Sequence, residues 1–244
     1  MTAAIHGVPA IDSIDWAAVE DALSRQGHAR LPGLLTREQT QSLSELWDDP
    51  HRFRSRVVMA RHGYGRGEYQ YFARPLPPLV AALRTMLYPP LAAIANRWQA
   101  ALGEDARFPE THAALEQRCK AAGQERPTPL LLDYGPGDFN CLHQDVYGEV
   151  FFPLQAAILL SQPGEDFAGG EFVLVEQRPR QQSRPMVVPL ALGDALIFAG
   201  RERPRRGTRG IHRVQLRHGV SEVAEGKQPG GRRRTLGLIF HDAR

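Results

Sequence analysis

Apolar residues recur at helical spacing through the first half of the chain, which indicates a series of amphipathic helices. The predicted helices cover residues 16–25, 37–47, 80–87, 91–102 and 111–122. Asp15 and Thr36 stand where the first two helices need N-caps, and Pro89-Pro90 is expected to separate the third from the fourth. The glycine- and aromatic-rich segment 62–72 is predicted to form a loop or hairpin. Residues 1–127 are therefore expected to form a mostly helical support region.

After residue 127 the pattern changes to short apolar runs separated by turn residues, which predicts strands. The segments are 130–134, 139–146, 149–160, 171–177, 186–190, 195–200, 211–223 and 234–240. About eight such strands is the number expected of a jelly roll. The boundary near residue 127 is interpreted as a change of layer inside a single domain, 1–244. The fold class is mainly β with a helical N-terminal region (α+β), and residues 128–244 form the jelly-roll core.

Composition limits the kinds of site and the compartment that we expect for this protein. The 244 residues are 42% hydrophobic and include two cysteines, Cys119 and Cys141, without a CxxC pattern, which argues against a disulfide framework or a zinc–thiolate site. No signal-peptide pattern begins the chain, and no apolar run reaches the ~18 residues of a membrane span, so we expect a cytoplasmic protein with no membrane partner.

Positive charge is concentrated in one part of the sequence. Residues 178–234 hold fourteen Lys/Arg against four Asp/Glu, a balance of +10, although the whole chain carries only +3. Such a region can attract phosphates or an acidic co-substrate. An arginine-rich, solvated surface would give the same pattern.

The motif His143-Gln144-Asp145 is the central candidate for chemistry. In an extended strand, residues two apart face the same side, so the imidazole and the carboxylate can reach one metal ion. This mixed nitrogen and oxygen ligation suits Fe(II), which in a facial triad needs one further histidine. His212 and His218 are the candidates for that position. We favour His218, because a turn and a strand containing arginines follow it, whereas His212 lies in an arginine-rich and exposed stretch.

A second candidate site lies in the strand that begins near residue 232. A fixed co-substrate carboxylate is best held by the donor fork of an arginine. Alternation places Arg233 and Thr235 on one face, and Arg232 and Arg234 on the other. If Thr235 faces inward, Arg233 is the carboxylate-binding residue; a solvent-exposed strand end is the alternative.

With these residues assembled, the sequence resembles the Fe(II)/2-oxoglutarate-dependent dioxygenases, and most closely their prolyl 4-hydroxylase-like branch. The ordered motifs are Tyr134, His143-Gln144-Asp145, His218-Gly219-Val220 and Gly231-Arg232-Arg233-Arg234-Thr235. Longer stretches, among them YGPGDFNCLHQDVYGE and RTLGLIFHDA, resemble a bacterial subgroup labelled as oxygenases acting on nucleic acid. The resemblance covers residues 128–243 well and the N-terminal part more loosely. Fifteen positions separate His218 from Arg233, more than is usual in the family, and EGKQPG is interpreted as an extra hairpin loop.

The resemblance implies a double-stranded β-helix, another name for this jelly roll, and a full set of site residues. His143, Asp145 and His218 would bind Fe(II), while Arg233 and Thr235, with the Tyr134 hydroxyl, would hold 2-oxoglutarate. O2 is the second co-substrate, and the reaction would hydroxylate an unactivated C–H bond with release of succinate and CO2. No general base is required.

The substrate is the open question at the level of sequence. One hypothesis is oxidative dealkylation of nucleic acid, with Tyr64, Tyr69, Tyr71 and Phe72 as candidate stacking groups. The alternative is a prolyl or other peptidyl substrate, or a small molecule. A non-catalytic, cupin-like metal-binding protein is a third interpretation, which we rank low because a cupin usually supplies more histidines and has no use for the Gly231–Thr235 strand.

Overall fold

The computed structural model describes residues 11–178, 180–208 and 210–244. The helices are α1 (Trp16–Gln26), α2 (Arg37–Glu45), α3 (Pro78–Ala101) and α4 (His112–Ala121), with short 3-10 helices η1 (Ile11–Ser13), η2 (Leu46–Asp48), η3 (Pro50–Arg52) and η4 (Met59–His62). The strands are β1 (His28–Leu31), β2 (Phe53–Val58), β3 (Gly65–Arg66), β4 (Glu68–Phe72), β5 (Leu130–Tyr134), β6 (Phe139–His143), β7 (Leu154–Leu159), β8 (Phe167–Gly169), β9 (Phe172–Gln177), β10 (Arg184–Val188), β11 (Ala195–Ala199), β12 (Glu202–Gly207), β13 (Gly210–Val220), β14 (Val223–Glu225) and β15 (Arg233–Ile239).

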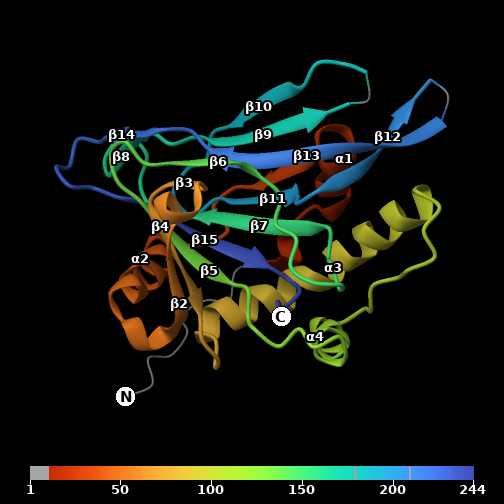
Figure 1. Cartoon of the computed structure of the whole chain (residues 1–244), viewed down its shortest axis with the longest axis horizontal. Coiled ribbons are helices and arrows are strands. Elements are labelled where there is room, and N and C mark those ends of the chain that lie inside the picture. The colour runs from red at the N-terminus through yellow and green to blue at the C-terminus, as the bar shows by residue number, and fades with distance from the viewer. Residues whose placement is uncertain (1–10, 179, 209) are drawn as a thin grey trace.

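Two antiparallel sheets form the body of the protein. The major sheet has seven strands in the order β1-β11-β7-β15-β5-β4-β2. The minor sheet has the order β10-β9-β13-β6-β3, with β12 also paired to β13, and β14 pairs with β8 separately. Figure 1 shows α3 running along the outer side of the major sheet, with β5 and β15 between this helix and the minor sheet. The arrangement is that of a jelly roll flanked by helices, as the sequence predicts.

Side-chain alternation gives the major sheet two different faces. On β15, Arg233, Thr235 and Gly237 line an internal cavity, whereas Leu236 and Leu238 belong to the main hydrophobic cluster. That cluster also contains buried residues of α1, α2, α3 and α4. The helices therefore cover the outer face of the major sheet, and its inner face is left to line the cavity.

The two caps predicted from the sequence, Asp15 and Thr36, are present, and the structure adds a third at Thr111. The Asp15 side chain accepts a hydrogen bond from the backbone N–H of Ala18, and Thr111 caps α4 in the same way. At α2, Thr36 and Gln39 form a reciprocal capping box. These local signals fix where the helices begin.

The predicted break at Pro89-Pro90 is wrong, because α3 continues through both prolines. Leu87, Tyr88 and Leu91, which surround the prolines, are fully buried, and Pro89 itself is exposed. Burial of this helix face against the core outweighs the hydrogen bonds that the prolines remove.

The continuous helix also changes the expectation about membrane spans. By length and composition, α3 is apolar enough to cross a membrane, and half of its apolar window is buried inside the protein. The buried Arg84 of this helix donates a 2.6 Å hydrogen bond to Asp242 near the end of the chain. These are the features of a core helix, which passes the same length test as a membrane span.

Several strand predictions need correction. The first 127 residues supply strands as well as helices: β1 pairs with β11, β4 with β5, and β3 with β6. β8 lies between the predicted strands 149–160 and 171–177, where no strand was expected, and β12 was not predicted either. β6 ends at His143, two residues before Asp145, although the strand was predicted to continue to residue 146. Short, polar or edge strands lack a long apolar run, so their sequences carry little signal.

Candidate metal centre and co-substrate pocket

A cavity of about 400 Å³ lies between the two sheets. Its walls come from β5, β7 and β15 of the major sheet and from β6 and β13 of the minor sheet. The six residues that the sequence favours as metal ligands or co-substrate ligands all line this cavity: Tyr134, His143, Asp145, His218, Arg233 and Thr235. Residues up to 101 positions apart in the chain are thereby brought to one place.

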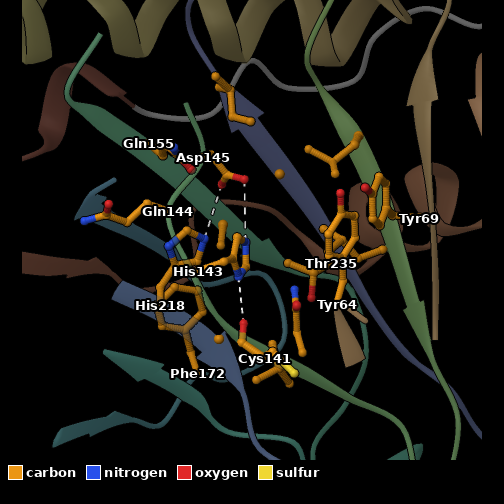
Figure 2. Close-up of a pocket in the computed structure, with 18 of the residues that line it drawn as sticks. Tyr64, Tyr69, Cys141, His143, Gln144, Asp145, Gln155, Phe172, His218 and Thr235 are labelled. Atoms are coloured by element: carbon orange, nitrogen blue, oxygen red, sulfur yellow. Dashed lines mark hydrogen bonds and ion pairs between the residues drawn. The ribbon is translucent and has the colours of Figure 1, made fainter. Parts of the chain in front are cut away.

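His143, Asp145 and His218 form a compact cluster of potential metal ligands. One ligand atom from each residue lies within 4.8 Å of the other two. The Nε2 atoms of His143 and His218 lie 3.5 Å and 3.3 Å from the Asp145 carboxylate oxygens. Figure 2 shows both imidazoles and the carboxylate directed toward one another. Two histidines and one carboxylate are the donor set of an iron facial triad.

The register of the minor sheet explains this convergence. His218 on β13 lies directly opposite His143 on β6. Asp145 follows the end of β6, and the intervening Gln144 side chain points away and donates to the carbonyl of Leu216 at 2.7 Å. The alternation predicted for His143 and Asp145 therefore persists past the strand end, because Gln144 ties the segment to β13.

The tautomer of His143 suits metal binding. Its Nδ1 lies 2.8 Å from the backbone carbonyl of Cys141, so Nδ1–H donates and Nε2 is left with a free lone pair. His218 is buried and stacks on Phe172 with an interplanar angle of 7°. These contacts fix the orientation of both rings.

Burial and neighbouring groups shift the pKa values of two of the three residues, His218 and Asp145. Burial lowers the pKa of His218 below its ordinary value, and the neighbouring His143 lowers it further. Burial alone would raise the pKa of Asp145, but the hydrogen bond from His218 and the charges of both histidines outweigh it and lower that pKa. Neutral imidazoles and an ionised carboxylate are the ligand forms that a divalent cation needs.

A chain of hydroxyl groups supports Asp145 and was not predicted. The Tyr147 hydroxyl donates to Oδ1 of Asp145 at 2.9 Å, and the Tyr71 hydroxyl lies 2.9 Å from that of Tyr147. Because Tyr147 uses its proton toward Asp145, Tyr71 is the donor in the second bond. A tyrosine two residues after Asp145 is a weak sequence signal, since only the fold shows where its hydroxyl points.

Arg233 is a buried cation in the same cavity. It is 2% exposed, its guanidinium donates to the Thr235 hydroxyl at 2.9 Å, and among the described residues no carboxylate pairs with it. Burial lowers the pKa of Arg233 to about 10, which still leaves the group charged at neutral pH. The Tyr134 ring lies 5.6 Å from the guanidinium carbon, and its hydroxyl accepts a bond from Asn140. A charged group buried in this way calls for an anionic ligand.

The neighbouring arginines face the other side of β15. Arg232 and Arg234 both bind the carboxylate of Asp133, Arg234 through Nε at 2.8 Å. Arg232 and Arg234 are thus held by Asp133 on the side of β15 away from the cavity, and Arg233 alone of the three points into the cavity. The extra loop before this strand packs on another turn, where Lys227 pairs with Glu165, so it does not displace Arg233.

The structure also excludes two residues that the sequence left open. His212 is exposed on β13, opposite Arg205 and six positions from His218, and it does not line the cavity. Phe72 was a candidate stacking group, but it is fully buried in the main core and stacks on Phe53. Gln155 was missed: its buried Nε2 lines the cavity and has no hydrogen-bond partner within the described part of the chain.

Comparison with known proteins gives the family. The Oxygenase-NA family, described as an oxygenase catalysing oxidative methylation of damaged DNA, matches residues 67–243. The chain belongs to this family. A related, uncharacterized protein of Mycobacterium tuberculosis is 41% identical over 234 residues, which cover 91% of this chain and 97% of the relative.

Solved structures similar to this Oxygenase-NA member confirm the fold. A 2OG-Fe(II) oxygenase family protein from Burkholderia pseudomallei has a TM-score of 0.53 at 15% identity, covering 95% of this chain and 94% of that one. A Trichoplax adhaerens prolyl hydroxylase, in complex with a hypoxia inducible factor peptide, has a TM-score of 0.50 at 13% identity, covering 93% and 89%. The predicted double-stranded β-helix is therefore confirmed. The chain is therefore an oxygenase by its family, and it carries the predicted His–Asp–His cluster in this fold.

Proposed function

We propose that this enzyme removes alkyl groups from nucleic acid by oxidation. In this proposal His143, Asp145 and His218 hold Fe(II), and Arg233, Thr235 and Tyr134 hold 2-oxoglutarate. The observation that carries it is the buried, unpaired charge of Arg233 in the same cavity as the three metal ligands.

The donor set fits Fe(II). It contains two imidazole nitrogens and one carboxylate, no thiolate, and leaves one side of the cluster open to the cavity. The Asp145 carboxylate accepts from Tyr147 through Oδ1, which leaves Oδ2 for the metal.

The pocket also fits 2-oxoglutarate. The distal carboxylate of this dianion would supply the counter-ion that Arg233 lacks, and the Thr235 hydroxyl and the Tyr134 hydroxyl would add hydrogen bonds. Arg233 is buried and lines the cavity, so 2-oxoglutarate would enter the cavity to reach it.

When bound, Fe(II), 2-oxoglutarate and O2 supply the oxidant that inserts one oxygen atom into a substrate C–H bond, with succinate and CO2 as co-products. Hydroxylation of an N-alkyl carbon on a base gives a hemiaminal, which breaks at the C–N bond to release an aldehyde and the unmodified base. The residues of this chain bind, orient and exclude water during this process. The family description of damaged DNA supports nucleic acid as the substrate.

The test measures two products in one reaction. Enzyme supplied with Fe(II), 2-oxoglutarate and an oligonucleotide carrying N-methylated bases should release formaldehyde and succinate in equal amounts. Asp145→Ala should release neither. Succinate release that responds to a prolyl peptide or a small molecule, but not to methylated oligonucleotide, would refute the nucleic-acid substrate and leave the cofactor chemistry standing.

A further inference from the structure

The connection between β2 and β4, residues 59–67, bridges the two sheets at the cavity. β2 and β4 form an antiparallel hairpin of the major sheet, with Val58 opposite Glu68. Within the connection, β3 pairs with β6 of the minor sheet, and the backbone N–H of Cys141 donates to the carbonyl of Tyr64 at 2.9 Å. Figure 1 shows β3 beside β6, the strand that ends at His143. We call residues 59–67 the bridging loop.

The base of the bridging loop is fixed beside the proposed co-substrate pocket. Met59 is fully buried in a cluster with Tyr134, and its N–H donates to the carbonyl of Gly67 at 3.0 Å. Gly67 has a φ of +102°, and a Cβ there would lie 2.8 Å from the Tyr134 ring. The loop is therefore held in place by close backbone packing and not by its polar side chains.

The tip of the bridging loop is basic and aromatic. Arg61, His62, Tyr64 and Arg66 are all exposed, and residues 59–67 contain no Asp or Glu. Within the part of the chain that the structure describes, neither Arg61 nor Arg66 forms an ion pair. Tyr64 is 51% exposed, lines the cavity and stacks on His62 with ring centroids 5.3 Å apart.

Exposed apolar residues adjoin this tip at the cavity. Five large hydrophobic residues are exposed in the described ranges, and three of them, Tyr64, Leu142 and Val146, line the cavity. Leu142 and Val146 flank the metal-ligand segment. Unpaired cations beside exposed aromatic and apolar surface are the combination with which proteins hold single-stranded nucleic acid, through phosphate contacts and base stacking.

The C-terminal basic region, residues 178–234, is less available than its charge suggests. Of the thirteen basic residues that the structure describes there, seven are in ion pairs: Arg178, Arg203, Arg205, Arg213, Lys227, Arg232 and Arg234. Arg233 is buried in the cavity. A carboxylate partner weakens the attraction of an arginine for phosphate. Glu176 is shared by three of these arginines and Asp133 by two, so pairing reduces the available charge without cancelling it.

We infer that the bridging loop is the surface that binds the substrate strand, with Arg61 and Arg66 on phosphates and Tyr64 stacked on a base at the cavity entrance. The inference rests on the proposed nucleic-acid function and names the residues that deliver the strand to the metal centre. It transfers the role expected of the C-terminal basic region to a loop in the first third of the chain.

The experiment compares two matched pairs of arginines. A fluorescein-labelled oligodeoxythymidylate of about 12 nucleotides is titrated with Fe(II)-loaded enzyme under argon, by anisotropy, from about 50 to 200 mM salt. One variant is Arg61→Gln/Arg66→Gln. The control is Arg184→Gln/Arg217→Gln, which removes two exposed charges without an ion-pair partner from the C-terminal basic region.

We expect the loop variant to bind about tenfold more weakly and to lose about 1.4 from the slope of log affinity against log salt, since each single-strand phosphate contact contributes about 0.7. The control variant should bind within about twofold of the wild type. Tyr64→Ala should weaken binding about tenfold, and Tyr64→Phe, which still stacks, should restore it.

The two ways of failing are distinguishable. Suppose that the wild type binds oligonucleotide with a clear salt dependence, but that only the control variant, or neither variant, weakens this binding. The bridging loop is then not the binding surface, and the nucleic-acid function stands. If the wild type does not bind oligonucleotide at all, the proposed substrate fails, and this inference fails with it.

Discussion

Removing the Tyr147 hydroxyl should weaken metal binding without changing the metal ligands themselves. Tyr147→Phe keeps the ring, which packs edge-on against Tyr71, and deletes the 2.9 Å hydrogen bond to Oδ1 of Asp145. Asp145 would then have one carboxylate oxygen without its donor, free to rotate away from the position that the histidines need.

The magnitude follows from the type of bond that is lost. A hydrogen bond to a charged acceptor contributes about 1.5–3 kcal/mol, and groups that orient metal ligands change metal affinity by about 10–100-fold. Tyr147 holds Asp145 in the metal-free protein as well, so part of the loss cancels in the binding equilibrium. We therefore expect Fe(II) binding to weaken by about tenfold, the lower end of that range.

The assay is an anaerobic titration with Fe(II), or with Co(II), whose visible absorption reports coordination geometry. Burial, then the Asp145 charge, raises the pKa of Tyr147, so the phenol stays protonated and the effect should be equal at about pH 6.5 and pH 8.5. Tyr71→Phe is the matched control: it removes the next hydroxyl, leaves the Tyr147–Asp145 bond in place, and should cost about threefold or less. Unchanged metal affinity in Tyr147→Phe would refute the reasoning.

Three further predictions concern buried charges and the choice of ligand. Arg233→Met should lower the affinity for 2-oxoglutarate at least about 100-fold, as measured by calorimetry. It should also raise the melting temperature of the ligand-free protein, because it removes a buried cation that has no carboxylate partner among the described residues. A lower melting temperature would contradict this. His218→Ala should abolish Fe(II) binding, whereas His212→Ala should leave it unchanged, and the reverse result would exclude the proposed triad. Burial lowers the pKa of His112 to about 4, below the ~6.5 of an unfolded chain. The unfolded state therefore takes up the proton first, and the free energy of unfolding falls as the pH drops from about 6.5 toward 4. His112→Gln keeps a donor for the Phe240 carbonyl but cannot titrate. In urea titrations, the loss of unfolding free energy between about pH 7.5 and 5 should therefore be about 2 kcal/mol smaller in the variant than in the wild type. An equal loss in both proteins would rule this out.

Much of the local structure could be read from short-range patterns. The caps at Asp15, Thr36 and Thr111 were predictable because a capping side chain bonds to backbone only a few residues away. Pro89 and Pro90 misled the prediction, since their local cost is outweighed by a buried face that the sequence does not display.

The candidate site divides in the same way. Alternation along one strand was enough to separate Arg233 and Thr235 from Arg232 and Arg234, and the order of the motifs was enough to indicate the enzyme class. By contrast, the roles of Tyr147 and Tyr71 depend on the contact between β4 and the segment that follows β6. Pairing between strands far apart in sequence leaves no local signal.

The sequence by itself therefore predicted the jelly-roll class, from the number of short strands. It also predicted the ligand types of the metal centre and the arginine strand, from the alternation of residues along single strands. The sequence already favoured His218 over His212, and the tertiary structure shows the physical reason, because the strand register sets His218 opposite His143. The tertiary structure also decided which basic residues remain available to bind phosphate. Seven basic residues of the C-terminal basic region take part in ion pairs, some of them sharing one carboxylate, whereas within the described residues Arg61 and Arg66 of the bridging loop form none. Net charge is additive along a chain, but the availability of a charge depends on its neighbours in space.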